Sequence, residues 1–454
     1  MNKKINNREI GAAVGLLFLF QGFMLEAYAD PIIWPLIGEK IGIGHSYTLA
    51  LTISGACSAA TTPIATKCIT IMDSKKLLVF SAAAATILCT AQIGIHSLST
   101  MILLRCALGI TLAFALTAIS IAIGTIFPPQ KRGFWIGLQG TLMGVASIIT
   151  PPLTGFLMET AYIGIVFFAP LPFSIIGIFL ILKYMMHPNS EKERQSIFDF
   201  KGAFFILLCL ASFFVITSKD DFGLSEKAVR CFVFLCILSA IAFFRTEKQI
   251  GDQGILPFSL FKNHRFIYII LASFFASSST TALYYSFSYY MLVHMQISPW
   301  ETGLAISLQF LVALFFSPLL GKYIKNRQVF LFAVYSSGIL MILLYLYMIL
   351  FLSATTPLWK IHGIMILFGI YAMVLTVASP YIAQNFTTEQ QRPYTIGGNR
   401  LANTLGYCVT LPLFTSILNH WNLRAEPGYD IIYLISILAT LCTLIAMHKS
   451  SLNS

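Results

Sequence analysis

The chain has 454 residues, of which 57% are hydrophobic and only 10% are charged, and its formal net charge is +11. About a quarter of the residues of ordinary soluble proteins are charged, so this composition excludes a soluble globular protein and indicates a polytopic membrane protein. Lys and Arg fall in short clusters between apolar segments, as the positive-inside rule describes, and not on one basic face. We therefore expect a lipid bilayer around the chain and no nucleic-acid partner.

A membrane-spanning helix needs about 20 mostly apolar residues, and the chain has fourteen such segments. They lie near residues 10–35, 46–70, 75–95, 98–126, 131–157, 162–186, 199–218, 226–245, 265–294, 299–324, 328–352, 357–384, 393–418 and 429–447. The grouping predicts an all-α integral membrane protein with two six-helix bundles, residues 1–186 and 263–454. A linker with two extra helices, residues 187–262, joins them.

The first segment follows a basic stretch and ends in Ala27-Tyr28-Ala29, which mimics a cleavable secretory signal. We expect it to remain as a membrane helix, because Glu26 directly precedes the supposed cleavage site and cleavage would leave an odd number of spans. Placing both termini in the cytoplasm puts most Lys and Arg residues on that side. The expected location is the inner (plasma) membrane.

Two carboxylates in this first segment, Glu26 and Asp30, lie four residues apart and therefore on one helical face. An ionised side chain in the bilayer interior costs roughly 3 kcal/mol or more unless it is paired or hydrated. Glu26 is therefore a candidate proton-coupling residue. Asp30 lies about 30 Å along the helix from Ile10, near the outer interface, so it is either part of this site or a solvated aspartate.

Arg105, in the fourth segment, does not deprotonate and needs a partner. A carboxylate of the same bundle would be that partner, and the opposing effects of burial and opposite charge would let the acid exchange a proton near neutral pH. Alternatively, Arg105 ties helices together through backbone carbonyls without moving protons.

Several aromatic or polar residues in later segments are candidates for a substrate cavity. Tyr284 and Tyr285 either line such a cavity or form an interfacial aromatic belt. Polar side chains either contact substrate or hydrogen-bond between helices, and Arg400 either contributes a charge or reaches the cytoplasmic surface. The full set is Tyr28, Tyr284, Tyr285, Gln309, Arg400 and Asn403.

Three blocks in the C-terminal half carry a family resemblance. Residues 255–266, Ile-Leu-Pro-Phe-Ser-Leu-Phe-Lys-Asn-His-Arg-Phe, are followed by Ser-Pro-Trp-Glu-Thr-Gly-Leu at 298–304 and Ser-Pro-Leu-Leu-Gly at 317–321. With this spacing the chain resembles the major facilitator superfamily and, within it, the fourteen-span drug:proton antiporter family. In the first span, Glu26 resembles the acidic residue of that family, with one extra methylene.

The resemblance also assigns roles in the fourth and fifth spans. Arg105 with Gly109 is similar to an Arg-x-x-x-Gly motif that exporters associate with proton transfer. The fifth span resembles the antiporter motif, a helix-packing element, in Gly140, Gly144, Pro151 and Gly155. The chain departs from the family in the loop after the second span, which has Thr66, Thr70 and Asp73, and at Asn403, where the family has an arginine.

The resemblance implies a secondary transporter that exports a small organic molecule in exchange for protons by alternating access, in which protonation of Glu26 releases or excludes the substrate. The alternatives are proton-coupled uptake of a nutrient or metallophore-like compound, and a transport-inactive sensor or scaffold. The sequence lacks a nucleotide-binding loop, Cys/His metal spacing and a nucleophile elbow. We therefore expect no enzyme activity, cofactor or metal, and a monomer whose partners are its substrate and protons.

Overall fold

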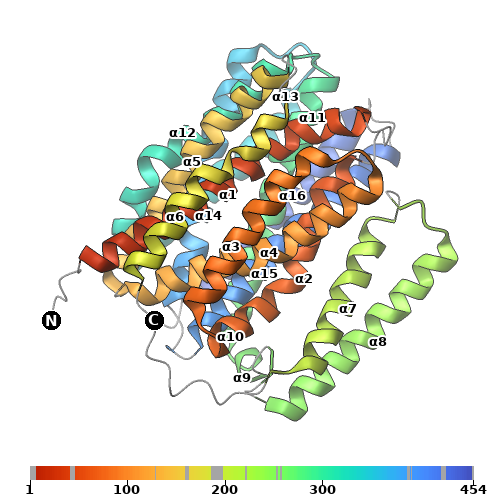
Figure 1. Ribbon diagram of the computed structural model, residues 1–454. Coiled ribbons are helices and arrows are strands. Elements are labelled where there is room, and N and C mark those ends of the chain that lie inside the picture. Colours follow the sequence, from red (N-terminus) through yellow and green to blue (C-terminus); the bar gives the residue numbers. More distant parts are fainter. Residues whose placement is uncertain are drawn as a thin grey trace.

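The computed structural model describes residues 7–40, 47–127, 129–158, 163–185, 198–219, 222–251, 254–255, 258–385, 389, 391–420 and 426–451. All regular structure in these residues is helical (Figure 1). The N-terminal part contains α1 (Asn7–Lys40), α2 (Tyr47–Ile71), α3 (Ser74–Ala91), η2 (Gln92–Gly94), α4 (Leu98–Ile126), α5 (Pro129–Met158), η3 (Ile163–Phe168) and α6 (Pro170–Tyr184).

Two further helices, α7 (Phe200–Thr217) and α8 (Glu226–Ile250), precede the C-terminal part. That part contains α9 (Phe258–Phe261), α10 (His264–Thr281), the π-helical turn η5 (Ala282–Ser286), α11 (Phe287–Val293), α12 (Pro299–Tyr323), α13 (Arg327–Phe351), α14 (Leu358–Asn385), α15 (Arg392–His420) and α16 (Glu426–Ser451).

Thirteen helical segments of the described chain are long and apolar enough to cross a membrane. They correspond to thirteen of the fourteen predicted spans, so the prediction of an all-helical, multi-pass membrane protein is confirmed. The remaining segment, 46–70, forms α2, a 25-residue helix that contains Pro63 and packs against α4 and α15. Most of the polar linker after the sixth span, residues 186–197, lies outside the described residues.

Within each half of the chain, most of the helices that pack closely together are not consecutive in sequence. In the N-terminal half α1 packs on α6, and α4 packs on α2 and α3, whereas in the C-terminal half α10 packs on α15 and α16, and α12 on α14. The two halves meet along α5 and α12 and along α2 and α15. Helices α7 and α8 pack on each other and lie at one side of the molecule, with α7 against α2 and α15 (Figure 1).

Small residues bring α5 and α12 close together. A Cβ atom on Gly140 would lie 2.9 Å from Ser317 Oγ, and one on Gly144 would lie 3.0 Å from the backbone nitrogen of Leu314. The Ser317 hydroxyl also donates a hydrogen bond of 2.7 Å to a backbone carbonyl of α5. Pro151 is buried further along α5. Gly155 lies in the same helix, but its surroundings are outside the described residues.

The loop between α2 and α3, where the sequence departs from the family pattern, uses its charges to fix helix ends. The Asp73 carboxylate caps α3 by accepting hydrogen bonds from the backbone nitrogens of Lys75 (3.0 Å) and Lys76 (3.3 Å). The Lys75 ammonium donates to the carbonyls of Leu182 (2.9 Å) and Met185 (2.7 Å) at the end of α6. This basic loop therefore ties α3 to the C-terminal end of α6.

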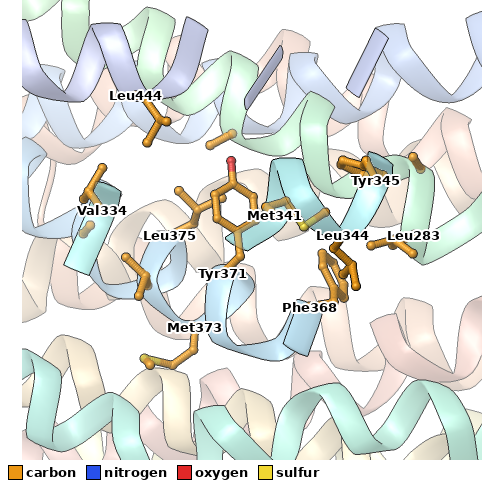
Figure 2. Close-up of a cluster of buried hydrophobic side chains, with 14 of the residues drawn as sticks. Leu283, Val334, Met341, Leu344, Tyr345, Phe368, Tyr371, Met373, Leu375 and Leu444 are labelled. Carbon is orange, nitrogen blue, oxygen red and sulfur yellow. The ribbon is translucent and has the colours of Figure 1, made fainter. Parts of the chain in front are cut away.

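The largest buried apolar cluster lies in the C-terminal half, around Tyr371 and Met341 (Figure 2). Tyr371 of α14 places its hydroxyl 3.0 Å from Ser279 Oγ of α10, and the Tyr345 hydroxyl of α13 donates to the Ser279 carbonyl. These bonds hold α10 against α13 and α14. They thereby hold in position the part of α10 that faces the centre of the molecule.

Candidate functional site

Glu26, Asp30 and Arg105 form one buried charge cluster. Arg105 donates from Nη1 to Glu26 Oε1 at 2.9 Å and from Nη2 to Asp30 Oδ2. The exposed fraction of the Arg105 side chain is 1%, that of Glu26 is 5% and that of Asp30 is 16%. The structure therefore places Asp30 in the cluster with the other two charges and not in solvent at the outer interface.

Three further hydrogen bonds hold the guanidinium and Glu26 in place. Arg105 Nε donates to the carbonyl of Ala50 in α2 at 2.8 Å, and Nη1 donates to Gln92 Oε1 at 3.2 Å. The Gln92 amide in turn donates to Glu26 Oε1 at 3.4 Å. Gln92 follows α3 directly, so the cluster joins the first four helices of the chain.

Trp34 closes the cluster on one side. Its indole nitrogen donates to Asp30 Oδ1 at 2.9 Å, and its ring lies 4.8 Å from the carbon of the Arg105 guanidinium, within cation–π range. Sequence reasoning missed both Trp34 and Gln92. The position of Trp34 four residues after Asp30, on the same helical face, was the available signal.

The cluster contains two carboxylates and one guanidinium. With both acids ionised its net charge is −1, and the uptake of a single proton makes it neutral. Because a buried site disfavours uncompensated charge, the arrangement can bind one proton while Arg105 keeps one ionised partner. This charge count gives the site the chemistry of reversible protonation.

A second feature is a cavity of about 500 Å³ between the two halves of the chain, within the range of about 300–1,000 Å³ typical of small-molecule sites. Residues of α1, α4, α5, α10, η5, α12, α14 and α15 line it. The lining includes five residues singled out in the sequence, namely Tyr28, Tyr284, Tyr285, Arg400 and Asn403. Gln309 is not among the lining residues. It is buried in α12, and its Oε1 has no hydrogen-bond partner among the described residues.

One part of the cavity wall is aromatic. The ring of Tyr28 from α1 stacks on Tyr284 with 6.5 Å between centroids and meets Phe310 of α12 edge-on at 5.0 Å. Tyr285 lies 5.2 Å from Tyr407 of α15. The π-helical turn η5 carries both Tyr284 and Tyr285, and both line the cavity.

The part of the wall formed by α15 is polar. Ile396, Asn399, Arg400, Asn403 and Tyr407 line the cavity with the i, i+3, i+4 spacing of one helical face. Among the described residues no carboxylate pairs with Arg400, and its Nε has no hydrogen-bond partner. Sequence reasoning missed Asn399, Tyr407 and Phe310, since nothing local distinguishes them from packing residues.

The charge cluster and the cavity lie on different faces of α1. Met24, Ala27 and Tyr28 line the cavity, whereas Glu26 and Asp30 are not among the lining residues and face α2, η2 and α4. A molecule in the cavity therefore does not touch the carboxylates in this conformation. In this conformation α1, which carries both Glu26 and Tyr28, connects the charge cluster to the cavity wall.

The described residues thus form an all-helical membrane protein with a cavity of small-molecule size between two helix groups. The sequence profile of the Major Facilitator Superfamily matches residues 13–411, with a second match over residues 270–449. The chain belongs to the Major Facilitator Superfamily and is a multi-pass membrane protein.

Curated relatives are similar to parts of the chain. The multidrug transporter protein MdtP of Bacillus subtilis is 26% identical over 203 residues, which is 44% of this chain and 36% of MdtP. The riboflavin transporter RibZ of Clostridioides difficile is 22% identical over 66% of this chain and 58% of RibZ. The multidrug efflux pump SdrM of Staphylococcus aureus is 24% identical over 66% of both chains. The chain thus spans from about a third to two thirds of the length of these relatives.

Solved structures share the fold over nearly the whole chain. The human organic anion transporter MFSD10 (TETRAN) superimposes with a TM-score of 0.66 at 12% identity, covering 97% of this chain and 100% of that one. A bacterial homologue of the iron transporter ferroportin, in an outward-facing state, gives a TM-score of 0.65 at 14% identity over 98% of this chain and 100% of the homologue. At these identities the likeness concerns the fold alone.

Proposed function

We propose that the protein is a proton-coupled exporter of a small organic molecule. The observation that carries the proposal is the buried cluster of two carboxylates and one guanidinium. Its net charge changes from −1 to zero when it binds one proton. The multidrug transporters among the relatives support the export direction. We further propose that the protein is a monomer in the inner (plasma) membrane, with both termini in the cytoplasm. Its two bundles, residues 1–186 and 263–454, are joined by the linker 187–262.

The proposed cycle alternates the side to which the cavity opens. A proton from the outer side neutralises the cluster, and its loss to the cytoplasm restores the net charge. Since α1 carries Glu26 on one face and Tyr28 on the other, a shift of α1 in response to this charge change would reshape the cavity wall. The small residues Gly140 and Gly144 let the two bundles pack closely along α5 and α12 and rock against each other.

Uptake by proton symport is the second candidate function, because the same charge cluster can drive transport in either direction. The relative RibZ, which is named as a riboflavin transporter, supports this candidate because riboflavin is a nutrient. A transport-inactive scaffold is disfavoured, since burying three charged groups is costly and serves no structural purpose that apolar residues would not serve.

The test is transport by purified full-length protein in proteoliposomes with an imposed pH gradient. The probes are fluorescent organic anions, cations and neutral compounds of similar size. We expect a gradient of one sign to drive at least one probe uphill, and Glu26→Gln to abolish this gradient dependence while leaving downhill exchange, because the substituted cluster has no carboxyl left to protonate beside the Arg105–Asp30 pair. Glu226→Gln, which changes a carboxylate that is 94% exposed, is the matched control and should transport like the wild type.

The sign of the productive gradient separates the two candidate functions. Movement of probe against the proton flow indicates export by antiport, and movement with it indicates symport. Gradient-driven transport that survives Glu26→Gln would rule out this cluster as the coupling site. Absence of transport for every probe at either gradient would favour the scaffold.

A further inference from the structure

We propose that the transported molecule is an organic anion, whose carboxylate, sulfonate or phosphate group binds Arg400 while its flat apolar body lies against the tyrosines of the cavity. This inference rests on the proposed transport function and names the substrate class of the same cavity. It concerns a different cation from Arg105, which already has Glu26 and Asp30 as partners.

Arg400 is a cation without a counter-charge among the described residues. It lines the cavity from α15, about two turns inside the helix from its first residue, Arg392. No carboxylate of the described chain forms an ion pair with it, and its Nε lacks a hydrogen-bond partner. A charge left in this state inside a membrane protein is costly unless water or a ligand compensates it, and an anionic group matches the guanidinium geometry.

The polar groups next to Arg400 also suit a ligand that accepts hydrogen bonds. Asn399 is 8% exposed, and its Oδ1 accepts a hydrogen bond of 2.8 Å from the Ser379 hydroxyl and contacts the Ser273 hydroxyl. Because its oxygen is engaged, the amide N–H groups of Asn399 are the ones that remain for a ligand in the cavity. Asn403, one turn further along the same face, adds a second amide.

The aromatic residues of the cavity wall determine the size and shape of the rest of the ligand. Tyr407 lies seven residues after Arg400 on the same face of α15, which corresponds to about 10 Å along the helix. Tyr285 lies 5.2 Å from Tyr407, and Tyr28 and Tyr284 stack next to it. A ligand with an acidic group at one end and a flat ring system at the other therefore fills the distance between the guanidinium and the rings.

A pair of arginines lies next to the same part of the cavity. The guanidinium of Arg132 in α5 donates to the carbonyl of Gln384 at 3.4 Å, and that of Arg392 in α15 donates to the same carbonyl at 3.1 Å. Gln384 lines the cavity. Arg392 forms a weak ion pair, at 3.8 Å, with the exposed carboxylate of Glu389. This end of the cavity thus has a positive potential, which attracts anions and repels cations.

The test is equilibrium binding to the purified full-length protein in detergent, without a pH gradient. The probes are 2-naphthoate, 2-naphthol and 2-naphthylmethylammonium, which share one ring system and differ in charge, together with the corresponding set built on a three-ring aromatic body. We expect the carboxylates to bind and the matched alcohols and ammonium compounds to bind at least roughly tenfold more weakly. Arg400→Gln should weaken carboxylate binding by roughly thirtyfold, and Arg400→Lys should lose less because it keeps the charge.

Thermal unfolding of the unliganded variants excludes a merely structural role for Arg400. Because this half-buried cation forms no ion pair with a carboxylate of the described residues, Arg400→Gln should unfold at the same temperature as the wild type or higher, and only its stabilisation by carboxylates should be lost. Arg230→Gln, at a side chain that is 77% exposed, is the control and should behave as the wild type in both measurements.

Several results would overturn the inference: equal binding of the three charge types, absence of binding by every carboxylate, carboxylate binding unchanged in Arg400→Gln, or a lowered unfolding temperature of that unliganded variant. The outcome is independent of proton coupling. Arg400-dependent anion binding by a protein that fails the proteoliposome test would contradict the proposed function and leave the anion site standing.

Discussion

At the scale of single residues, the decisive feature is the unequal number of positive and negative groups around Arg105. One guanidinium has two carboxylate partners, a backbone carbonyl and an amide oxygen. Removing one carboxylate leaves a complete ion pair, whereas removing the guanidinium leaves two acids facing each other in a buried site. Substitutions of these residues should therefore have very different effects on stability.

We predict that Arg105→Gln lowers the free energy of unfolding by about 3–5 kcal/mol, the cost typical of an uncompensated buried charge. Glu26→Gln should change it little, because the Arg105–Asp30 pair remains. Thermal unfolding of the purified variants in detergent at neutral pH measures both effects. The triple variant Arg105→Gln, Glu26→Gln, Asp30→Asn carries no charge at the site and should recover much of the lost stability. Equal unfolding temperatures for wild type and Arg105→Gln would show that the cluster is hydrated and not buried.

The sequence indicated the charged members of the site because charges are rare in apolar segments. Glu26, Asp30 and Arg105 stand out against hydrocarbon side chains, and the expense of burying them implied that they meet. The sequence could not show that Glu26 faces away from the cavity, because that depends on how α1 is rotated against α2 and α4. Gln92 and Tyr407 resemble ordinary helix residues, and only the packing of helices far apart in sequence gives them a place in a site.

At the scale of helices, close approach depends on positions where even a methyl group has no room. Gly109 of α4 is one of them, since a Cβ atom there would overlap the backbone carbonyl of Ser54 in α2 and lie 3.0 Å from Cys57 Cβ. Backbone atoms of a packed helix cannot rotate away as a long side chain can. The whole of α2 would have to move, and with it the carbonyl of Ala50 that holds Arg105.

We predict that Gly109→Ala destabilises the protein by about 1–3 kcal/mol, the usual cost of overpacking, and also impairs transport through the displaced Arg105. The matched control is Gly363→Ala in α14, where a Cβ atom would have no heavy atom within 4 Å; this variant should unfold at the wild-type temperature or slightly above it, because alanine favours helix. The check is thermal unfolding together with transport by the same preparations. A stable, active Gly109→Ala protein would contradict the close packing of α2 and α4.

Helix boundaries followed from hydropathy because the bilayer sets the length of every span, and the observed helices begin and end near the predicted residues. The π-helical turn within the segment predicted at 265–294 was not foreseen. Its residues, Ala282–Ser286, show no proline or glycine to mark it. The aromatic residues it carries were recognised from composition, but the sequence did not show that Tyr284 and Tyr285 both line the cavity.

At the scale of the whole molecule, the number of spans decides on which side of the membrane each terminus lies. The start of α1 lies beside the end of α6, where Gly11 faces Tyr184, and the end of α16 lies beside the start of α10, where Lys449 lies 5.3 Å from the Tyr268 ring. Both termini are at the same end of the molecule (Figure 1). This arrangement agrees with α2 crossing the membrane as a fourteenth span.

We predict that both termini face the cytoplasm. A green fluorescent protein fused after residue 454 should fluoresce, and alkaline phosphatase at the same position should be inactive, because the first reporter matures in the cytoplasm and the second outside it. A fusion of each reporter within residues 219–224, between α7 and α8, is the control and should give the opposite pair of signals. Active phosphatase at the C-terminus would place that end outside the cytoplasm and overturn the proposed orientation.

The two faces of α1 have a consequence for how such a protein can diversify. The carboxylates point to one side of the helix and Tyr28 to the other. In the proposed mechanism, substitutions among the cavity residues therefore alter which compounds bind without altering the carboxylates that take up the proton. Substrate selectivity and proton coupling then depend on different faces of α1, so selectivity can change during evolution while the coupling residues stay the same.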